Sequence, residues 1–116
     1  MEFIEAQAFT RYLSDYLDED EYRALQKQIG LRPDVGDLIP GTGGFRKIRW
    51  ADKRRGKGRR GGLRVIYYHF AAEHQIWLMT LYGKNEAADL TPREKKALKA
   101  AIEAECKARE AVRRKR

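Results

Sequence analysis

Two apolar runs separated by a short polar turn constrain the fold of this chain most. Residues 63–71 (LRVIYYHFA) are rich in β-branched and aromatic residues, and residues 76–82 (IWLMTLY) are almost continuously apolar. Runs of this length and composition are typical of strands, and the nearly unbroken one fits a buried central strand. Glu73 and His74 lie at the turn between them. The pair therefore predicts an antiparallel hairpin at the centre of a sheet.

A third strand is predicted just before this hairpin, at residues 45–51 (FRKIRWA). Side chains alternate between the two faces of a strand, so Lys47 and Arg49 share one face and Arg46 lies on the other. Phe3 and Ile4 begin a further short extended segment near the N-terminus. Residues 34–44 hold four glycines and a proline, which predicts a loop. We interpret Gly41, Gly43 and Gly44 as turn glycines and not as a phosphate loop, because no helix follows them.

Helices are predicted on both sides of the strands. Apolar residues at helical spacing predict a helix over 9–17 and a second over 22–29 that ends at Gly30. Asp18 and Glu21 can form a capping box between the two. Thr91-Pro92-Arg93-Glu94 is a strong helix start, and this helix can continue to about Ala111. The order β-α-α-β-β-β-α predicts an α+β fold, with a helical hairpin and a C-terminal helix packed on a small, mainly antiparallel sheet.

Length and composition favour one domain over residues 1–116. The single cysteine, Cys106, excludes an intramolecular disulfide and suits a reducing, cytoplasmic setting. We expect no signal peptide and no membrane association, because no stretch approaches 18 apolar residues. The two histidines, His69 and His74, and one distant cysteine do not form a metal-ligand pattern, so neither a metal nor another cofactor is expected.

Positive charge is concentrated in residues 45–64, which hold ten Lys or Arg and one acid, Asp52. The local charge is +9, whereas the whole chain carries +8. A focused cationic segment on a small domain is typical of nucleic-acid binding. Its centre, residues 53–62, is predicted to be a flexible basic loop, and residues 112–116 a basic tail. Alternation also places Tyr67 and Tyr68 on opposite faces of their strand, so at least one of them is expected in the core.

Three motifs give the chain a family resemblance: PGTGGFRKIRWA (40–51), GGLRVIYY (61–68) and LMTLYGKNEAADLT (78–91). Together with the order of elements, they resemble the RelE-like toxins of bacterial type II toxin–antitoxin modules, in particular the HigB-type branch. The resemblance implies a ribosome-dependent endoribonuclease that cuts mRNA in the ribosomal A site. It also implies a cognate helix-turn-helix antitoxin, similar to HigA, that neutralises the toxin.

The resemblance also implies part of the site, Lys47, Arg49, Arg64, Lys84 and Asn85, and the concentration of charge adds the basic residues of 53–62. The RNA 2′-hydroxyl attacks the adjacent phosphate, while cationic side chains stabilise the developing charge and a further group assists proton transfer. Glu86 is the acid that the sequence places near this site. The best-known RelE proteins use a C-terminal aromatic, and here no Tyr or Phe follows Tyr82. The expected catalytic residues are Lys47, Arg49, Arg64, Tyr82 and Lys84, and the expected contacts to RNA and the ribosome are Arg46, Lys53, Arg54, Arg55, Lys57, Arg59, Arg60 and Asn85.

Other functions remain open at the level of sequence. The basic loop and sheet would suffice for a non-catalytic RNA-binding module. A toxin of the ParE type would act on DNA gyrase and would not need convergent Lys and Arg residues. A purely structural interaction protein would explain the helical hairpin but not the concentration of charge.

Overall fold

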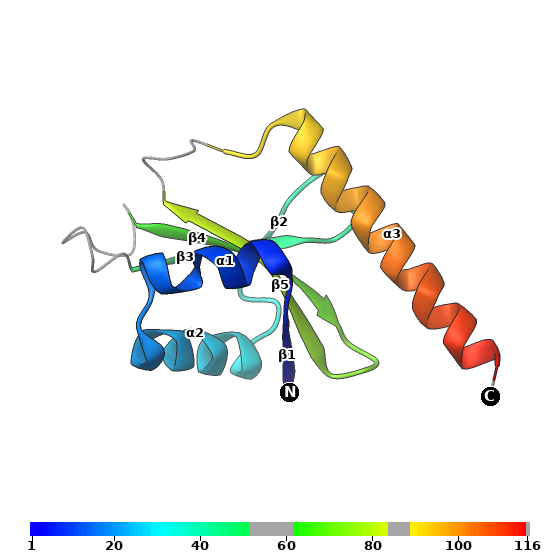
Figure 1. Ribbon diagram of the computed structural model, residues 1–116, viewed down its shortest axis with the longest axis horizontal. Helices are drawn as coiled ribbons and strands as arrows, with labels where there is room; N and C mark the ends of the chain where they lie inside the picture. Colours follow the sequence, from blue (N-terminus) through cyan, green and yellow to red (C-terminus); the bar gives the residue numbers. More distant parts are fainter. Residues whose placement is uncertain (52–61, 84–88, 116) are drawn as a thin grey trace.

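The computed structural model describes residues 1–51, 62–83 and 89–115. A five-stranded mixed sheet lies between helices on its two faces, and three helices occur in the described residues (Figure 1). The α+β class predicted from the sequence is therefore confirmed. The strand order is β1-β5-β4-β3-β2, and the elements in chain order are β1 (Glu2–Glu5), α1 (Gln7–Tyr16), α2 (Glu19–Leu31), β2 (Asp37–Leu38), β3 (Arg46–Trp50), β4 (Leu63–Phe70), β5 (Gln75–Gly83) and α3 (Pro92–Arg114).

The predicted meander is confirmed, since β3, β4 and β5 pair antiparallel in sequence order. Strand β1 adds to the outer edge of β5 in parallel. Strand β2 was not predicted, because it lies inside the segment interpreted as a loop. Only two of its residues pair with β3, Asp37 with Lys47 and Leu38 with Arg46. Two residues produce no alternation pattern that a sequence could reveal.

The helix starts follow the predicted caps. The Asp18 carboxylate accepts a hydrogen bond from the Glu21 N–H at 2.8 Å, and the Glu21 carboxylate accepts one from the Asp18 N–H at 3.0 Å. Thr91 and Glu94 form the same box at α3. The helix ends were predicted less well. Helix α2 passes through Gly30 to Leu31, so the prediction that it ends at Gly30 is wrong by one residue. Helix α3 continues to Arg114, through most of the predicted basic tail.

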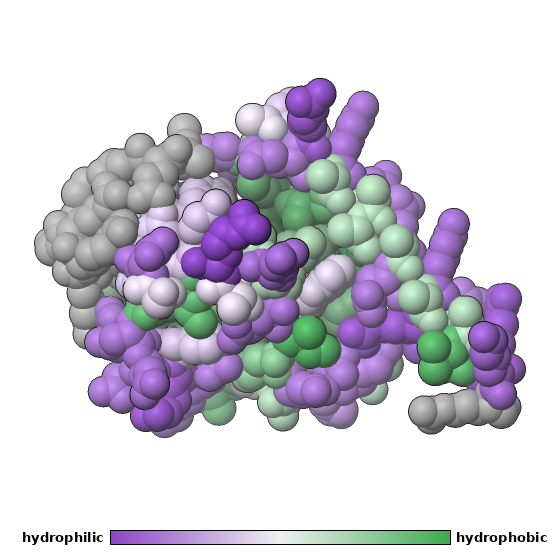
Figure 2. Space-filling view, viewed as in Figure 1, coloured by the Kyte–Doolittle hydropathy of each residue, from purple (hydrophilic) through white to green (hydrophobic). Residues whose placement is uncertain are grey.

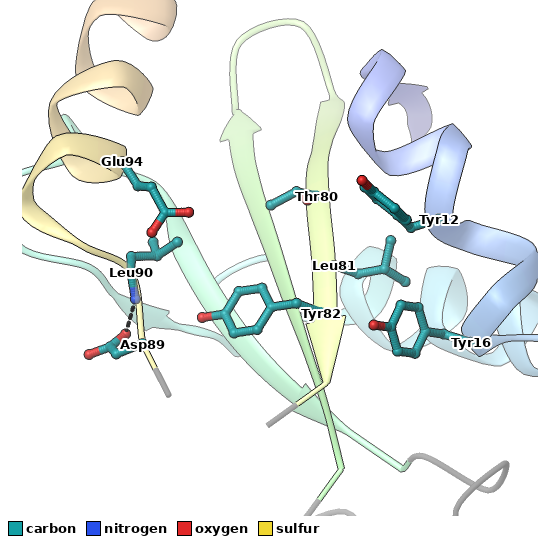
Figure 3. Close-up of a pocket in the computed structure, with 8 residues that line it drawn as sticks. All are labelled: Tyr12, Tyr16, Thr80, Leu81, Tyr82, Asp89, Leu90 and Glu94. Atoms are coloured by element: carbon teal, nitrogen blue, oxygen red, sulfur yellow. Dashed lines mark hydrogen bonds between the residues drawn. The ribbon is translucent and has the colours of Figure 1, made fainter. Parts of the chain in front are cut away.

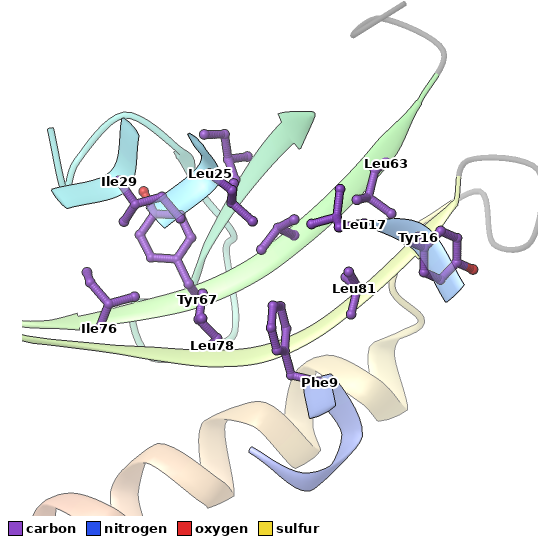
Figure 4. Close-up of a cluster of buried hydrophobic side chains, with 12 residues drawn as sticks. Phe9, Tyr16, Leu17, Leu25, Ile29, Leu63, Tyr67, Ile76, Leu78 and Leu81 are labelled. Atoms are coloured by element: carbon purple, nitrogen blue, oxygen red, sulfur yellow. The ribbon is translucent and has the colours of Figure 1, made fainter. Parts of the chain in front are cut away.

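Two clusters of apolar side chains hold the layers together, one on each face of the sheet. The larger cluster joins α1 and α2 to the sheet around Phe9, Leu25 and Ile29, all fully buried (Figure 4). The smaller one joins Leu98 and Ile102 of α3 to the opposite face. Side chains alternate between the two faces along β4, so Arg64 lies on the same face as Ile66 and Phe70, the face that packs against α3.

The C-terminal half of α3 is held against the β4–β5 hairpin by Arg109. Its guanidinium carbon lies 3.7 Å from the centre of the Phe70 ring. The same group donates to Glu105 at 2.8 Å and to Gln75 at 2.6 Å. These contacts combine cation–π attraction with charged hydrogen bonds. Within the described residues, none of the helices has the length and apolarity needed to span a bilayer.

Candidate functional site

A row of three predicted site residues crosses three neighbouring strands. Arg49 of β3 is paired with Arg64 of β4, and Arg64 is paired with Tyr82 of β5. Directly paired residues project from the same face of a sheet. That face is the one packed against α3, because Ile66 and Phe70, which share the face of Arg64, contact the α3 cluster. Lys47 lies two residues before Arg49 and so belongs to the same face.

Arg64 is the buried cation of this row, with only 7% of its surface exposed. Its one hydrogen bond to another described residue goes to the Gly62 carbonyl at 3.5 Å, the upper limit for such a bond. Arginine is almost never fully buried unless it is paired. A desolvated guanidinium with so little hydrogen bonding is well suited to an anionic ligand, because a charged bond is stronger in a low-dielectric site than in water.

Lys47 forms an ion pair with an acid that the sequence analysis missed. Its Nζ atom lies 3.7 Å from Oδ1 of Asp89. The Leu90 N–H also donates to this oxygen, at 2.8 Å. This backbone bond first, and then the Lys47 charge, lower the pKa of Asp89. The expectation that Glu86 is the only acid near the site is therefore wrong, while the position of Glu86 itself lies outside the described residues. Asp89 could have been found from its place two residues before the Thr91 cap.

Tyr82 presents a buried hydroxyl that has no hydrogen-bond partner among the described residues. Burial raises the pKa of this hydroxyl, and the negative charges of Asp89 and Glu94 raise it further, while Arg64 opposes them. Tyr82 is therefore protonated at neutral pH. It can donate a proton or a hydrogen bond, but the phenolate needed for a general base is disfavoured.

The remaining predicted contacts divide into two groups. Arg46 lies on the opposite face of β3 from Lys47, and its guanidinium donates to the carbonyls of Asp34 at 3.2 Å and Gly36 at 2.8 Å. It therefore braces the loop before β2 in this structure. The other predicted residues lie outside the described part of the chain, and they are Lys53, Arg54, Arg55, Lys57, Arg59, Arg60, Lys84 and Asn85.

Two other interpretations from the sequence can be checked. Tyr67 and Tyr68 do lie on opposite faces, and Tyr67 is fully buried, with its hydroxyl donating to the Pro33 carbonyl at 2.8 Å. Gly43 and Gly44 have positive φ, 77° and 117°, as expected for turn glycines. Among the described residues, no group of three or more His, Cys, Asp or Glu could hold a metal ion.

We call Arg49, Arg64 and Tyr82, with Lys47 on the same face, the cation row. A cavity of about 290 Å³ lies beside it, between α1 and the start of α3 (Figure 3). Tyr82 ends the row and also lines the cavity. Asp89 lines the cavity and pairs with Lys47, which lies beside the row. Figure 2 shows apolar atoms gathered in a hollow between the same two helices. A second cavity of about 230 Å³ continues the hollow and shares Thr80, Leu90 and Glu94 with the first.

No protein-family model matches the chain.

Proposed function

We propose that this protein is the toxin of a type II toxin–antitoxin module, of the RelE-like, HigB-type class, and that it cuts mRNA in the ribosomal A site. The observation that carries the proposal is the cross-strand pairing of Arg49 with Arg64, with Lys47 on the same face. Two adjacent cations on one face repel each other, which is destabilising in a sheet unless an anion joins them. A phosphate of RNA is such an anion, and Arg binds it with two parallel hydrogen bonds.

The arrangement suits internal attack by the RNA itself. The 2′-oxygen forms a bond to phosphorus as the bond to the 5′-oxygen breaks, which leaves a 2′,3′-cyclic phosphate and a 5′-hydroxyl. Arg49, Arg64 and Lys47 stabilise the charge that develops on the phosphate oxygens. Tyr82, which burial keeps protonated, supplies the proton that the leaving 5′-oxygen requires. Lys84, outside the described residues, is the candidate that accepts the 2′-hydroxyl proton.

The proposal includes partners. A cognate antitoxin with a helix-turn-helix domain would neutralise the toxin, and the ribosome would present the mRNA in the cytoplasm. The basic residues between 53 and 60 would contact RNA backbone without reading its sequence.

Induced expression with primer extension on a translated reporter mRNA tests the proposal. The wild-type chain should arrest growth and produce codon-phased cuts confined to the translated region, with 5′-hydroxyl ends. Arg64→Ala should abolish the cuts. Arg23→Ala is the control, because this arginine is exposed on α2, where it pairs only weakly with Asp20 at the surface.

Other outcomes would replace the proposal. Cuts that carry 5′-phosphates would contradict the mechanism. Growth arrest with blocked DNA synthesis and no cuts would indicate a gyrase-directed toxin of the ParE type. RNA binding by the purified protein, with neither arrest nor cuts, would indicate a non-catalytic RNA-binding module.

A further inference from the structure

The cavity beside the cation row has an unusual lining for a protein that binds a polyanion. Three tyrosines reach it, Tyr12 and Tyr16 from α1 and Tyr82 from β5, and two carboxylates, Asp89 and Glu94, lie on the side of α3 (Figure 3). Its volume of about 290 Å³ is at the lower end of the range for ligand sites. The cavity has room for one small ring system.

The carboxylates decide which part of an RNA can enter. They would repel a phosphate, so the cavity does not extend the phosphate site. They accept hydrogen bonds and cannot donate them. One oxygen of Glu94 accepts the Thr91 N–H at 2.8 Å as part of the helix cap, which leaves its second oxygen available to a ligand. A ligand group that carries N–H donors on an aromatic ring fits this lining.

We infer that the cavity binds one nucleobase of the RNA, with a preference for guanine, beside the phosphate held by Arg64 and Lys47. This inference rests on the proposed RNA substrate. The tyrosine rings provide surfaces on which a base can stack, as in proteins that bind unpaired RNA. Tyr82 links the two sites, because it is paired with Arg64 in the sheet and also lines the cavity.

Guanine is favoured by the pattern of its Watson–Crick edge. It presents two adjacent donors, N1–H and the N2 amine, which one carboxylate can accept together. Adenine and cytosine present one amine beside an acceptor nitrogen. Uracil presents a single N–H between two carbonyl oxygens, which a carboxylate repels. The buried Tyr82 hydroxyl, unpartnered among the described residues, can accept an N–H of the base through an oxygen lone pair and keep its own proton for the leaving 5′-oxygen.

NMR titration of the ¹⁵N-labelled full chain with the four ribonucleosides tests the inference without any cleavage. Nucleosides carry no phosphate, so the cation row does not contribute. Guanosine should shift the amide signals of Thr80, Leu81 and Glu94 most strongly, and uridine least. Each of these residues lines the cavity.

Two variants make the test specific. Glu94→Gln keeps the capping box, since Gln serves equally at that position, but removes the charge. It should weaken guanosine binding about tenfold and should not weaken uridine binding, because the repulsion of the uracil carbonyls is removed. Tyr12→Leu should weaken all four nucleosides by about tenfold, through lost stacking. Glu103→Gln, the same change at an exposed position of α3 outside the cavity, should change nothing.

The outcomes separate this inference from the proposed function. Equal shifts for all four nucleosides, no shifts at the cavity, or insensitivity to Glu94→Gln would each overturn the guanine site, even if the protein cuts mRNA as proposed. Guanosine binding at the cavity, lost in Glu94→Gln, would support the base site even if the protein cuts nothing.

Discussion

Arg64 offers the sharpest test of the site, because its burial predicts opposite effects on activity and on stability. The substitution is Arg64→Met, which preserves much of the side-chain volume and removes the charge. Arg64 is 93% buried, and its one hydrogen bond to another described residue, to Gly62, is 3.5 Å long. Within the described part of the chain, little therefore compensates the desolvation of this cation. A residue that costs stability is retained for function.

The magnitudes follow from this environment. Replacing a buried ion pair by well-packed apolar side chains is often neutral or stabilising by about 1–4 kcal/mol, and a buried cation with few partners carries the same kind of desolvation cost. The weak bond to Gly62 offsets only about 1 kcal/mol of this. We therefore expect the free energy of unfolding to stay the same or rise by about 1–2 kcal/mol. Cleavage, in contrast, should slow by about 10²–10³-fold, because one preorganised contact to the developing charge is lost.

Arg46→Met is the matched comparison on the neighbouring strand. Arg46 donates two hydrogen bonds to loop carbonyls, and its loss should lower the free energy of unfolding by about 1–3 kcal/mol. Urea unfolding measures the stability of both variants. Single-turnover cleavage of ribosome-bound mRNA measures the activity of Arg64→Met against the wild type. Easier unfolding of Arg64→Met than of Arg46→Met, or cleavage by Arg64→Met at the wild-type rate, would contradict this prediction.

Three further predictions concern charge, ionisation and backbone strain. In Asp89→Asn, Lys47 loses its acidic partner and becomes available to a phosphate of RNA. The slope of log K against log salt concentration, measured by fluorescence anisotropy, should therefore steepen by somewhat less than one unit. An unchanged slope would contradict this. The pKa of Tyr22 is raised far above its usual value by burial and by its hydrogen bond to Glu5, so the stabilisation is complete below about pH 10 and is lost as the pH rises further. Tyr22→Phe should therefore show a shallower alkaline loss of unfolding free energy than the wild type, and parallel curves would rule out the linkage. Gly44→Ala should cost about 1–3 kcal/mol in thermal unfolding, since Gly44 has a φ of 117°, and a wild-type midpoint would show that the turn relaxes.

The parts of the fold that the sequence predicts are those with local signals. Both capping boxes were found because their residues are three positions apart. The central strands were found because β4 and β5 must be apolar on both faces. In contrast, β2 and the parallel pairing of β1 with β5 depend on contacts between distant segments, and no local pattern encodes them.

In the candidate site, too, local patterns were predicted from the sequence and contacts between distant segments were not. Alternation places Lys47 and Arg49 together, but it does not specify which residue of β4 lies opposite. The register does so, and a shift of one residue would turn Arg64 to the other face. Asp89 was missed because an acid before a helix looks like part of the loop. Its place two residues before the Thr91 cap marks it as a candidate, and the folded chain shows which cation it joins, since it lies 3.7 Å from Lys47.

The start of α3 connects the two halves of the site. Asp89 precedes the Thr91 cap by two residues, and Glu94 follows it by three, so one helix terminus orients both carboxylates. Both carboxylates line the cavity near Tyr82, and Asp89 also pairs with Lys47. A phosphate and a base of one nucleotide are joined by a single sugar, so a protein that binds both must place its cationic and acidic groups a few ångströms apart. The short rigid segment between Asp89 and Glu94, held by the cap, meets that requirement.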